Sequence, residues 1–356
     1  MIKTKQVDTK EITKQISFID ELKQYDKSLF NPYIIKSKGL KTTEVFDAYW
    51  RFACERQKVF FKKYEGKTVP WTNDPIIKTY KFTNAYRASD RVSQYLIKNV
   101  IYNGEKYSPE DTFFRIILFK LFNKIDTWEY LEKSIGEINF KDYSYDKYNR
   151  ALLNAINEKN TIYSAAYIMP SGSKEFGCEK KHQNNLKLIE LMMKDNVPAK
   201  IAKTKTLKEL YELLLSYPTV GSFLAFQYAI DINYSELCDF DEMSFVVAGP
   251  GAKRGIEKSF EDKGKYTYED IIKYMAENQE EHFKRLDLDF KSLWGRRLQL
   301  IDCQNLFCET DKYSRVAFPD CNSKVKGKRI KQKYKANLKA IDFFYPPKWG
   351  INEKIK

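Results

Sequence analysis

Three carboxylates stand close together in the segment CDFDEMSF: Asp239, Asp241 and Glu242. A carboxylate shielded from water can stabilise a sugar cation or activate a water molecule, the chemistry that separates a base from its sugar. Asp241 follows Gly221 by 20 residues (241 − 221). Asp241 and Glu242 are therefore the candidate catalytic acids, and Asp239 is the weakest of the three. The alternative is that all three are solvated loop acids or helix caps.

The segment YPTVG, residues 217–221, is an expected turn that precedes these acids. Residues 222–231, which follow the turn, have apolar residues at helical spacing. A glycine at a helix N-terminus lets backbone N–H groups approach a phosphate closely. The layout resembles the helix-hairpin-helix DNA glycosylases, whose hairpin reads L-P-G-V-G and whose catalytic Asp follows at about this distance. An ordinary turn between two helices is the alternative. On the glycosylase interpretation, the hairpin lies near residues 213–231 and the DNA backbone contacts Thr219, Val220, Gly221 and Ser222.

The hairpin departs from that pattern at two positions. Thr219 stands where the first glycine is expected. Phe223 stands two residues past the second glycine, where glycosylases with lyase activity carry a lysine. If the chain cuts N-glycosidic bonds, water rather than an amine is the expected nucleophile.

A second glycine-rich segment, GPGAKRGI, opens an expected helix and is a candidate phosphate-binding loop. It lacks the G-K-[ST] ending of a P-loop, and a rigid turn is the alternative. Its predicted DNA-binding residues are Gly249, Gly251, Lys253 and Arg254.

Polar residues elsewhere are candidates for a base-recognition pocket. Asn84, Arg87 and Asp90 are spaced three apart, so a helix would place them on one face, which could line a pocket or be an exposed ion-pair face. Gln304 and Asn305 suit base-edge recognition, and the following segment FCETDKYSR concentrates charge. The full set of predicted pocket residues is Asn84, Arg87, Asp90, Arg91, Glu55, Gln304 and Asn305, with Lys312 and Arg315 as DNA contacts.

The composition favours a polyanionic partner. The 356 residues carry 62 Lys and Arg against 48 Asp and Glu, a net charge of +14, and phosphate contacts release counterions. Residues 323–339 hold eight basic residues and no acid, so this segment is either a solvated extension or a phosphate-contacting tail that includes Lys328 and Arg329. The cysteines and histidines lack metal-ligand spacing, and we expect no metal and no cofactor.

The apolar pattern predicts a mainly α fold with a helix-hairpin-helix, DNA glycosylase-like arrangement. We expect three regions: an N-terminal extension over 1–42, a catalytic domain over 43–322 and a basic tail over 323–356. No apolar leader opens the chain and no run approaches 18 apolar residues, which predicts a cytoplasmic protein away from membranes. The principal expected helices cover 43–63, 82–102, 109–123, 146–159, 178–194, 206–216, 222–231, 267–281 and 288–300.

Five strings carry a more specific resemblance: YWRFACERQKVFF, FTNAYRASDRVSQYL, YPTVGSFLAFQYAIDINYSE, DEMSFVVAGPGAKRGI and QNLFCETDKYSR. Over residues 43–315 the chain resembles the helical domain of the alpha-glutamyl/putrescinyl thymine pyrophosphorylase group. That domain is named together with 5-hydroxymethyluracil DNA kinase and placed with the DNA glycosylases. The resemblance implies an enzyme acting on a modified pyrimidine in phage-type DNA. It also implies that Asp241 or Glu242 is the acid and that Asn84, Arg87, Asp90 and Arg91 line the pocket.

Three functions remain open. The first is a monofunctional glycosylase that excises a hypermodified pyrimidine from double-stranded DNA, in defence against phages, with no obligate protein partner. The second is a transferase that places an amine or amino acid on pyrophosphorylated 5-hydroxymethyluracil. The third is a non-catalytic DNA-binding module. The chain has no kinase nucleotide motif, so we do not expect it to be a kinase.

Overall fold

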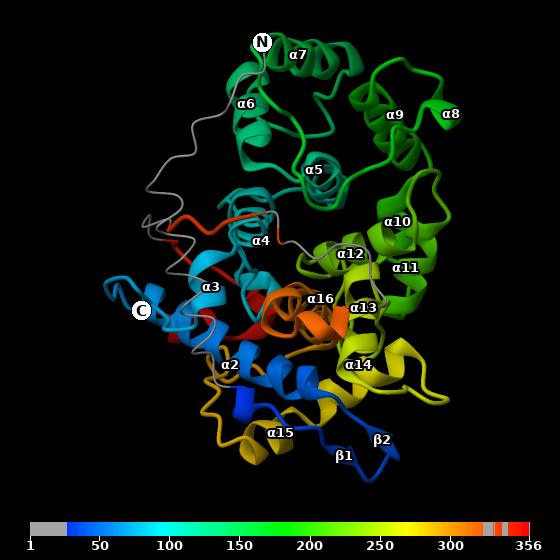
Figure 1. The fold of residues 1–356 in the computed structure, drawn as a ribbon. Helices are drawn as coiled ribbons and strands as arrows, with labels where there is room; N and C mark the ends of the chain where they lie inside the picture. The colour runs from blue at the N-terminus through cyan, green and yellow to red at the C-terminus, as the bar shows by residue number, and fades with distance from the viewer. Residues whose placement is uncertain (1–26, 323–329, 331, 337–340, 356) are drawn as a thin grey trace, which may run out of the picture. The chain divides into compact units, whose positions relative to one another are not determined.

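The computed structural model describes residues 27–322, 330, 332–336 and 341–355 (Figure 1). The expectation of a mainly α fold is confirmed, because helices dominate the described residues. Their only paired strands, β1 (Ile34–Ile35) and β2 (Leu40–Lys41), form a short antiparallel hairpin. Lys328 and Arg329 lie outside the described residues.

The chain divides into two compact units, each built from segments that are distant in the sequence. This division differs from the expected single domain over 43–322 between two extensions. The first unit takes the described residues of Met1–Ala85, Ala248–Lys291 and Asp302–Ala340, and the second takes Tyr86–Val247, Ser292–Ile301 and the described residues of Ile341–Lys356.

The first unit is organised around the long helix α2, which Thr43 caps by accepting a hydrogen bond from the Val45 amide. Helix α13 lies against α16 because two glycines allow close approach: a Cβ at Gly255 would stand 2.1 Å from the Phe307 carbonyl oxygen. The buried His282 ring stacks on Trp50, with ring centroids 5.1 Å apart. The helices of this unit are α2 (Glu44–Tyr64), α3 (Pro75–Thr79), α13 (Pro250–Ser259), α14 (Tyr268–Glu277), α15 (Gln279–Arg285) and most of α16 (Leu300–Ala317).

The second unit packs around α5 and α12, which are buried over most of their length. Ser108 caps α5 at the expected position, and Pro109 and two acids occupy its first turn, where they complement the helix dipole. Besides four short helical segments treated below, the helices of this unit are α4 (Arg91–Tyr95), α5 (Pro109–Phe122), α6 (Ile125–Ile135), α7 (Tyr145–Asn157), α8 (Ser173–Phe176), α9 (Lys181–Lys194), α10 (Val197–Ile201), α11 (Leu207–Leu215) and α12 (Ser222–Asn233).

Three expected helices differ from the structure. Residues 82–86 are irregular, and helix starts only at η2 (Arg87–Ser89), which α4 and the π-helical η3 (Leu96–Ile101) follow. The helix expected over 267–281 is broken between α14 and α15. Residues 288–299 are not helical. Trp294 and Gly295 adopt left-handed backbone conformations within them, and helix begins only at Leu300.

The C-terminal residues 341–355, which the sequence placed in the basic tail over 323–356, are part of the second unit. Tyr345 is fully buried in the second unit, and its hydroxyl shares a hydrogen bond with Ser89. Trp349 packs edge-on against Tyr234. Two short 3₁₀ segments, η5 (Pro347–Trp349) and η6 (Asn352–Lys354), complete this part of the unit.

Candidate active site

The hairpin predicted near 213–231 is a tight turn between α11 and α12, which pack against each other. Thr219 has a φ of +67°, the left-handed conformation that glycine adopts most easily. This explains why the resembling hairpins carry glycine at that position. Gly221 is the extended N-cap of α12, and no side chain caps the helix. The first amides of α12 are thus available, although phosphate binding at the turn stays a prediction.

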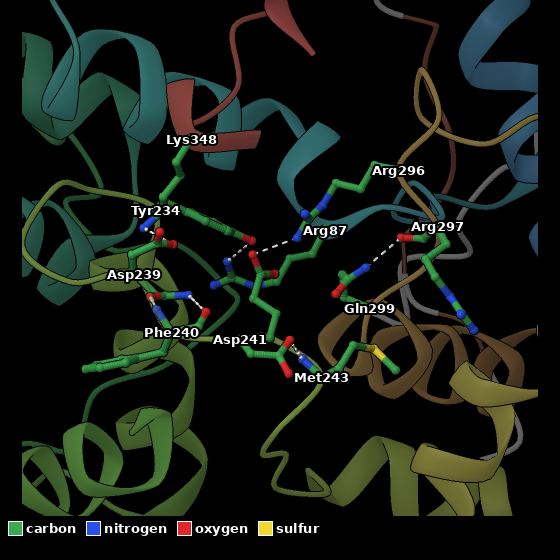
Figure 2. Close-up of polar contacts among 12 residues, drawn as sticks. Arg87, Tyr234, Asp239, Phe240, Asp241, Met243, Arg296, Arg297, Gln299 and Lys348 are labelled. Atoms are coloured by element: carbon green, nitrogen blue, oxygen red, sulfur yellow. Dashed lines mark hydrogen bonds and ion pairs between the residues drawn. The ribbon is translucent and has the colours of Figure 1, made fainter. Parts of the chain in front are cut away.

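The loop that follows α12 is held by the side chain of Asn233. Its Nδ2 donates to the Phe240 carbonyl at 3.0 Å, and its Oδ1 accepts from the Phe240 amide at 2.9 Å (Figure 2). Asp239 is largely exposed and lies 3.5 Å from the Lys348 ammonium. The loop therefore has one conformation set by local bonds, and Asp239 lies at its outer side.

Asp241 does not occupy the interior position that its spacing from Gly221 predicted. Asp241 is exposed, and its Oδ1 accepts a hydrogen bond from the Met243 amide at 2.9 Å (Figure 2). The Asp241 carbonyl also accepts from the Ser244 amide and hydroxyl. Asp241 is thus the first residue of a tight turn, and its carboxylate caps that turn.

Glu242 is the buried carboxylate of the cluster, with only 6% of the residue exposed. Its Oε1 accepts a hydrogen bond from Arg296 Nη2 at 2.7 Å. Burial raises the pKa of Glu242 above its usual value, and the neighbouring Arg296 charge partly opposes that shift. The Arg296 guanidinium lies over the Trp349 ring, 3.7 Å from its centroid. Glu242 is therefore a buried, oriented carboxylate with raised basicity.

A second buried charge cluster, which the sequence analysis missed, lies in the same unit. Asp231 of α12 contacts Arg87 Nη1 at 2.8 Å and Lys120 Nζ at 3.1 Å, and all three side chains are almost fully buried. Tyr167 lies within cation–π distance of both cations. Burial lowers the pKa of Lys120 to about 8, despite the opposing charge of Asp231. Two cations thus share one carboxylate, which leaves one excess positive charge.

The predicted helical face of Asn84, Arg87 and Asp90 does not form. Asn84 belongs to the irregular segment before η2, in the first unit, where its Oδ1 accepts from Arg56 Nη2 at 3.0 Å. Arg87 is buried in the second unit, whereas Arg91 is exposed at the start of α4. The spacing argument required one continuous helix, and the chain is helical only from Arg87 onward.

Most of the remaining predicted residues of the first unit are engaged in internal contacts. Glu55 accepts from the Thr72 hydroxyl. Lys312 contacts Glu309 at 2.7 Å, while Arg254 and Arg315 both contact the buried Asp311. Gln304 is buried on α16, Asn305 is half-buried, and Lys253 lies over the Tyr268 ring.

The glycines of the second predicted phosphate loop have a packing role. A Cβ at Gly251 would stand 2.3 Å from the Cys308 Sγ, and Gly255 makes the close approach described above. The segment is helix α13, with Gly249 as its N-cap. DNA contact by Gly249 and Gly251 stays a prediction.

Over the described residues, no group of three or more His, Cys, Asp or Glu side chains could hold a metal ion. All six cysteines are free thiols. Within the same residues, no helix is both long and apolar enough to cross a membrane.

Taken together, the chain is a mainly α protein in which the second unit holds an oriented, buried carboxylate beside a helical hairpin. Comparison with known proteins identifies its class: the family model described as "5-hmdU DNA kinase, helical domain" matches residues 43–323. The chain belongs to this helical-domain family.

A curated relative is the "5-hmdU DNA kinase" of Bacillus phage SP10, which is 28% identical over 321 residues. The alignment covers 85% of this chain and 50% of the relative, so the chain spans about half the length of that protein. No solved structure matches the chain.

Proposed function

We propose that the chain is an enzyme that acts on 5-hydroxymethyluracil, or a derivative of it, in double-stranded DNA. The family and the phage relative's printed name support this substrate class, and the net charge of +14 suits a DNA partner. We further propose that the reaction is excision of the modified base. The observation that carries this finer proposal is the buried Glu242 carboxylate, held in place by Arg296.

Excision requires a bond between C1′ of the sugar and the base nitrogen to break while water adds to C1′. The base must leave the stack to bring this bond to an enzyme group. Glu242 would accept the proton of the attacking water, or stabilise the positive charge that develops on the sugar. A general base is most effective when its pKa lies near the working pH, so the upward shift of the Glu242 pKa favours this role.

The neighbouring Asp241 is a poorer candidate for this role. It faces solvent, where a carboxylate is hydrated, and it already accepts the Met243 amide. We therefore assign the role of catalytic carboxylate to Glu242. The sequence had left this role open between Asp241 and Glu242.

The test uses a synthetic duplex with one 5-hydroxymethyluracil and a second duplex in which that base carries a phosphorylated hydroxymethyl group. Free base and abasic sites are measured by mass spectrometry and alkaline strand cleavage. We expect base release by the wild type and by Asp241→Asn, and loss of release by Glu242→Gln, which keeps the shape of the side chain. Equal rates for wild type and Glu242→Gln would refute the assignment, and no release from either duplex would refute excision.

Transfer at the exocyclic carbon is the second candidate function, and the relative's name favours it. Phosphorylation of the hydroxymethyl group converts a poor leaving group into a good one, which an amine could then displace. In that reaction the carbon–oxygen bond breaks, a carbon–nitrogen bond forms, and phosphate or pyrophosphate leaves with the electron pair. The same mass spectrometry distinguishes the reactions, because transfer gives a new nucleoside still attached to the DNA. If neither product forms but the duplex still binds, the chain is a DNA-binding module.

A further inference from the structure

The first unit contains a cavity of about 650 Å³, and Glu55 is the one predicted pocket residue in its lining. Helix α2, the start of α3, helix α16 and the residues near Leu29 line it. Pockets of roughly 300–1,000 Å³ accommodate small organic ligands, so the size is appropriate for one. The wall has two chemically different parts.

One part of the wall is cationic. Arg51, Lys58 and Lys78 line the cavity, and neither lysine has an ion-pair or hydrogen-bond partner among the described residues. Arg51 uses its Nε to donate to the Leu29 carbonyl, which leaves the terminal nitrogens of its guanidinium. Guanidinium and ammonium groups arranged in this way suit a phosphate.

The two carboxylates of the cavity are already occupied. Glu55 accepts from the Thr72 hydroxyl. Asp74 accepts from Tyr313 Oη at 2.6 Å and from the amides of Ile76 and Ile77. The lining carries three cations against two carboxylates, and the carboxylates are bound to protein donors. The lining therefore has one more cationic than anionic side chain, and the hydrogen bonds of both carboxylates come from neutral donors rather than from these cations.

The other part of the wall is apolar and aromatic. Phe30, Phe52 and Leu288 line it, and the ring centroids of Tyr313 and Phe52 are 5.5 Å apart. These aromatic side chains are largely buried, and their atoms that border the cavity can contact a nucleobase. Burial raises the pKa of the Cys54 thiol, so it is not a reactive thiolate, and the cavity is suited to binding rather than to covalent chemistry.

We infer that this cavity binds a nucleoside phosphate, with the phosphate at Arg51, Lys58 and Lys78 and the base against the aromatic wall. The ligand chemistry is shared by a free nucleotide and by one nucleotide of a single strand. This inference goes beyond the proposed function, because it concerns groups in the first unit and does not require Glu242 to be catalytic.

The test is calorimetric titration of the full chain with thymidine 5′-monophosphate, with thymidine and with a single-stranded tetrathymidylate, at low salt. We expect the monophosphate to bind and thymidine not to bind. The double variant Lys58→Gln/Lys78→Gln should weaken binding by about tenfold or more, since each lysine contributes a positive charge that salt screens little at low ionic strength. Both lysines are exposed, so folding should be unaffected.

The matched control is Lys36→Gln/Lys67→Gln, which removes two exposed lysines of the same unit that do not line the cavity. Its affinity should equal that of the wild type. Binding of the tetranucleotide alone, with the same dependence on Lys58 and Lys78, supports the inference with a strand as the source. Absence of binding to both phosphate ligands overturns the inference, as does equal weakening in the control or unchanged affinity in Lys58→Gln/Lys78→Gln. Base release by the Glu242 site is measured separately and would be unaffected by those results.

Discussion

Replacing Arg296 by methionine should destabilise the protein strongly at alkaline pH and little at acid pH. Arg296 is the charged partner of Glu242, whose side chain is 6% exposed, while that of Arg296 is 18% exposed. Removing one partner of a buried ion pair costs about 3–5 kcal/mol. Water reaches part of the Arg296 site, and methionine keeps some packing on Trp349, so we expect a loss of about 2–4 kcal/mol at pH 8.

The sign of the pH dependence follows from the Glu242 pKa. Burial already raises this pKa in the folded wild type, and Arg296 opposes the shift. Arg296→Met removes the opposing charge, so the folded-state pKa rises further. Between the unfolded and folded pKa values, the folded variant binds a proton that the unfolded chain has lost. Its stability therefore falls as the pH rises through this window, by at most about 1.4 kcal/mol per pH unit.

The assay is urea unfolding of wild type and variant at pH 5, 6, 7 and 8, followed by circular dichroism. The control is Arg296→Met/Glu242→Gln, in which no charge remains to be buried, so most of the pH-dependent loss should disappear. A variant with a pH-independent deficit, or with wild-type stability at pH 8, would show that Glu242 is not held as a buried charge.

Five other substitutions test separate parts of the structure. Asp231→Asn should cost about 3–5 kcal/mol in urea unfolding, because Arg87 and Lys120 would remain buried without a counter-charge. Lys120→Met should lower the free energy of unfolding far less. Because the Lys120 pKa is lowered in the folded state, the wild type should gain stability relative to Lys120→Met as the pH rises from about 8 to 10.5. Gly255→Ala should lower the thermal midpoint strongly, because its Cβ would meet the Phe307 carbonyl, whereas Gly221→Ala, with open space at its Cβ, should leave the midpoint nearly unchanged. Thr219→Gly should raise stability by about 0.5–1 kcal/mol by relieving the left-handed backbone at that residue, and a loss of stability would show that φ +67° is not strained.

Local signals in the sequence were sufficient for helices whose ends are set locally. The Ser-Pro-Glu-Asp start of α5 lies where expected, because the Ser108 cap and Pro109 act within one turn. Local signals were insufficient for residues 288–300, whose apolar spacing suggested a helix. There the Tyr86 hydroxyl accepts from the Leu293 amide and donates to the Arg296 carbonyl, contacts that span more than 200 residues. Tertiary bonds of this kind override a local pattern.

The buried Asp231 cluster shows what a sequence signal can and cannot supply. Helix α12, SFLAFQYAIDIN, is apolar on nearly all sides, so an aspartate within it indicates a buried charge that needs a partner. That signal could have singled out Asp231. Its partners, Arg87 and Lys120, lie more than 100 residues away, and only the tertiary structure identifies them.

The two candidate acids illustrate the same limit at the scale of one residue. The number of residues after Gly221 identifies the loop that holds both carboxylates. It does not show which of the two side chains points inward, because irregular backbone has no fixed side-chain period. The directions of the two side chains follow from the turn Asp241–Ser244, in which the Asp241 carboxylate accepts a hydrogen bond from the Met243 amide and faces outward. Glu242 then faces Arg296, which both orients the carboxylate and limits the rise of its pKa. An Arg296 variant that folds at pH 6 but has lost base release would therefore separate the orienting role of Arg296 from its contribution to stability.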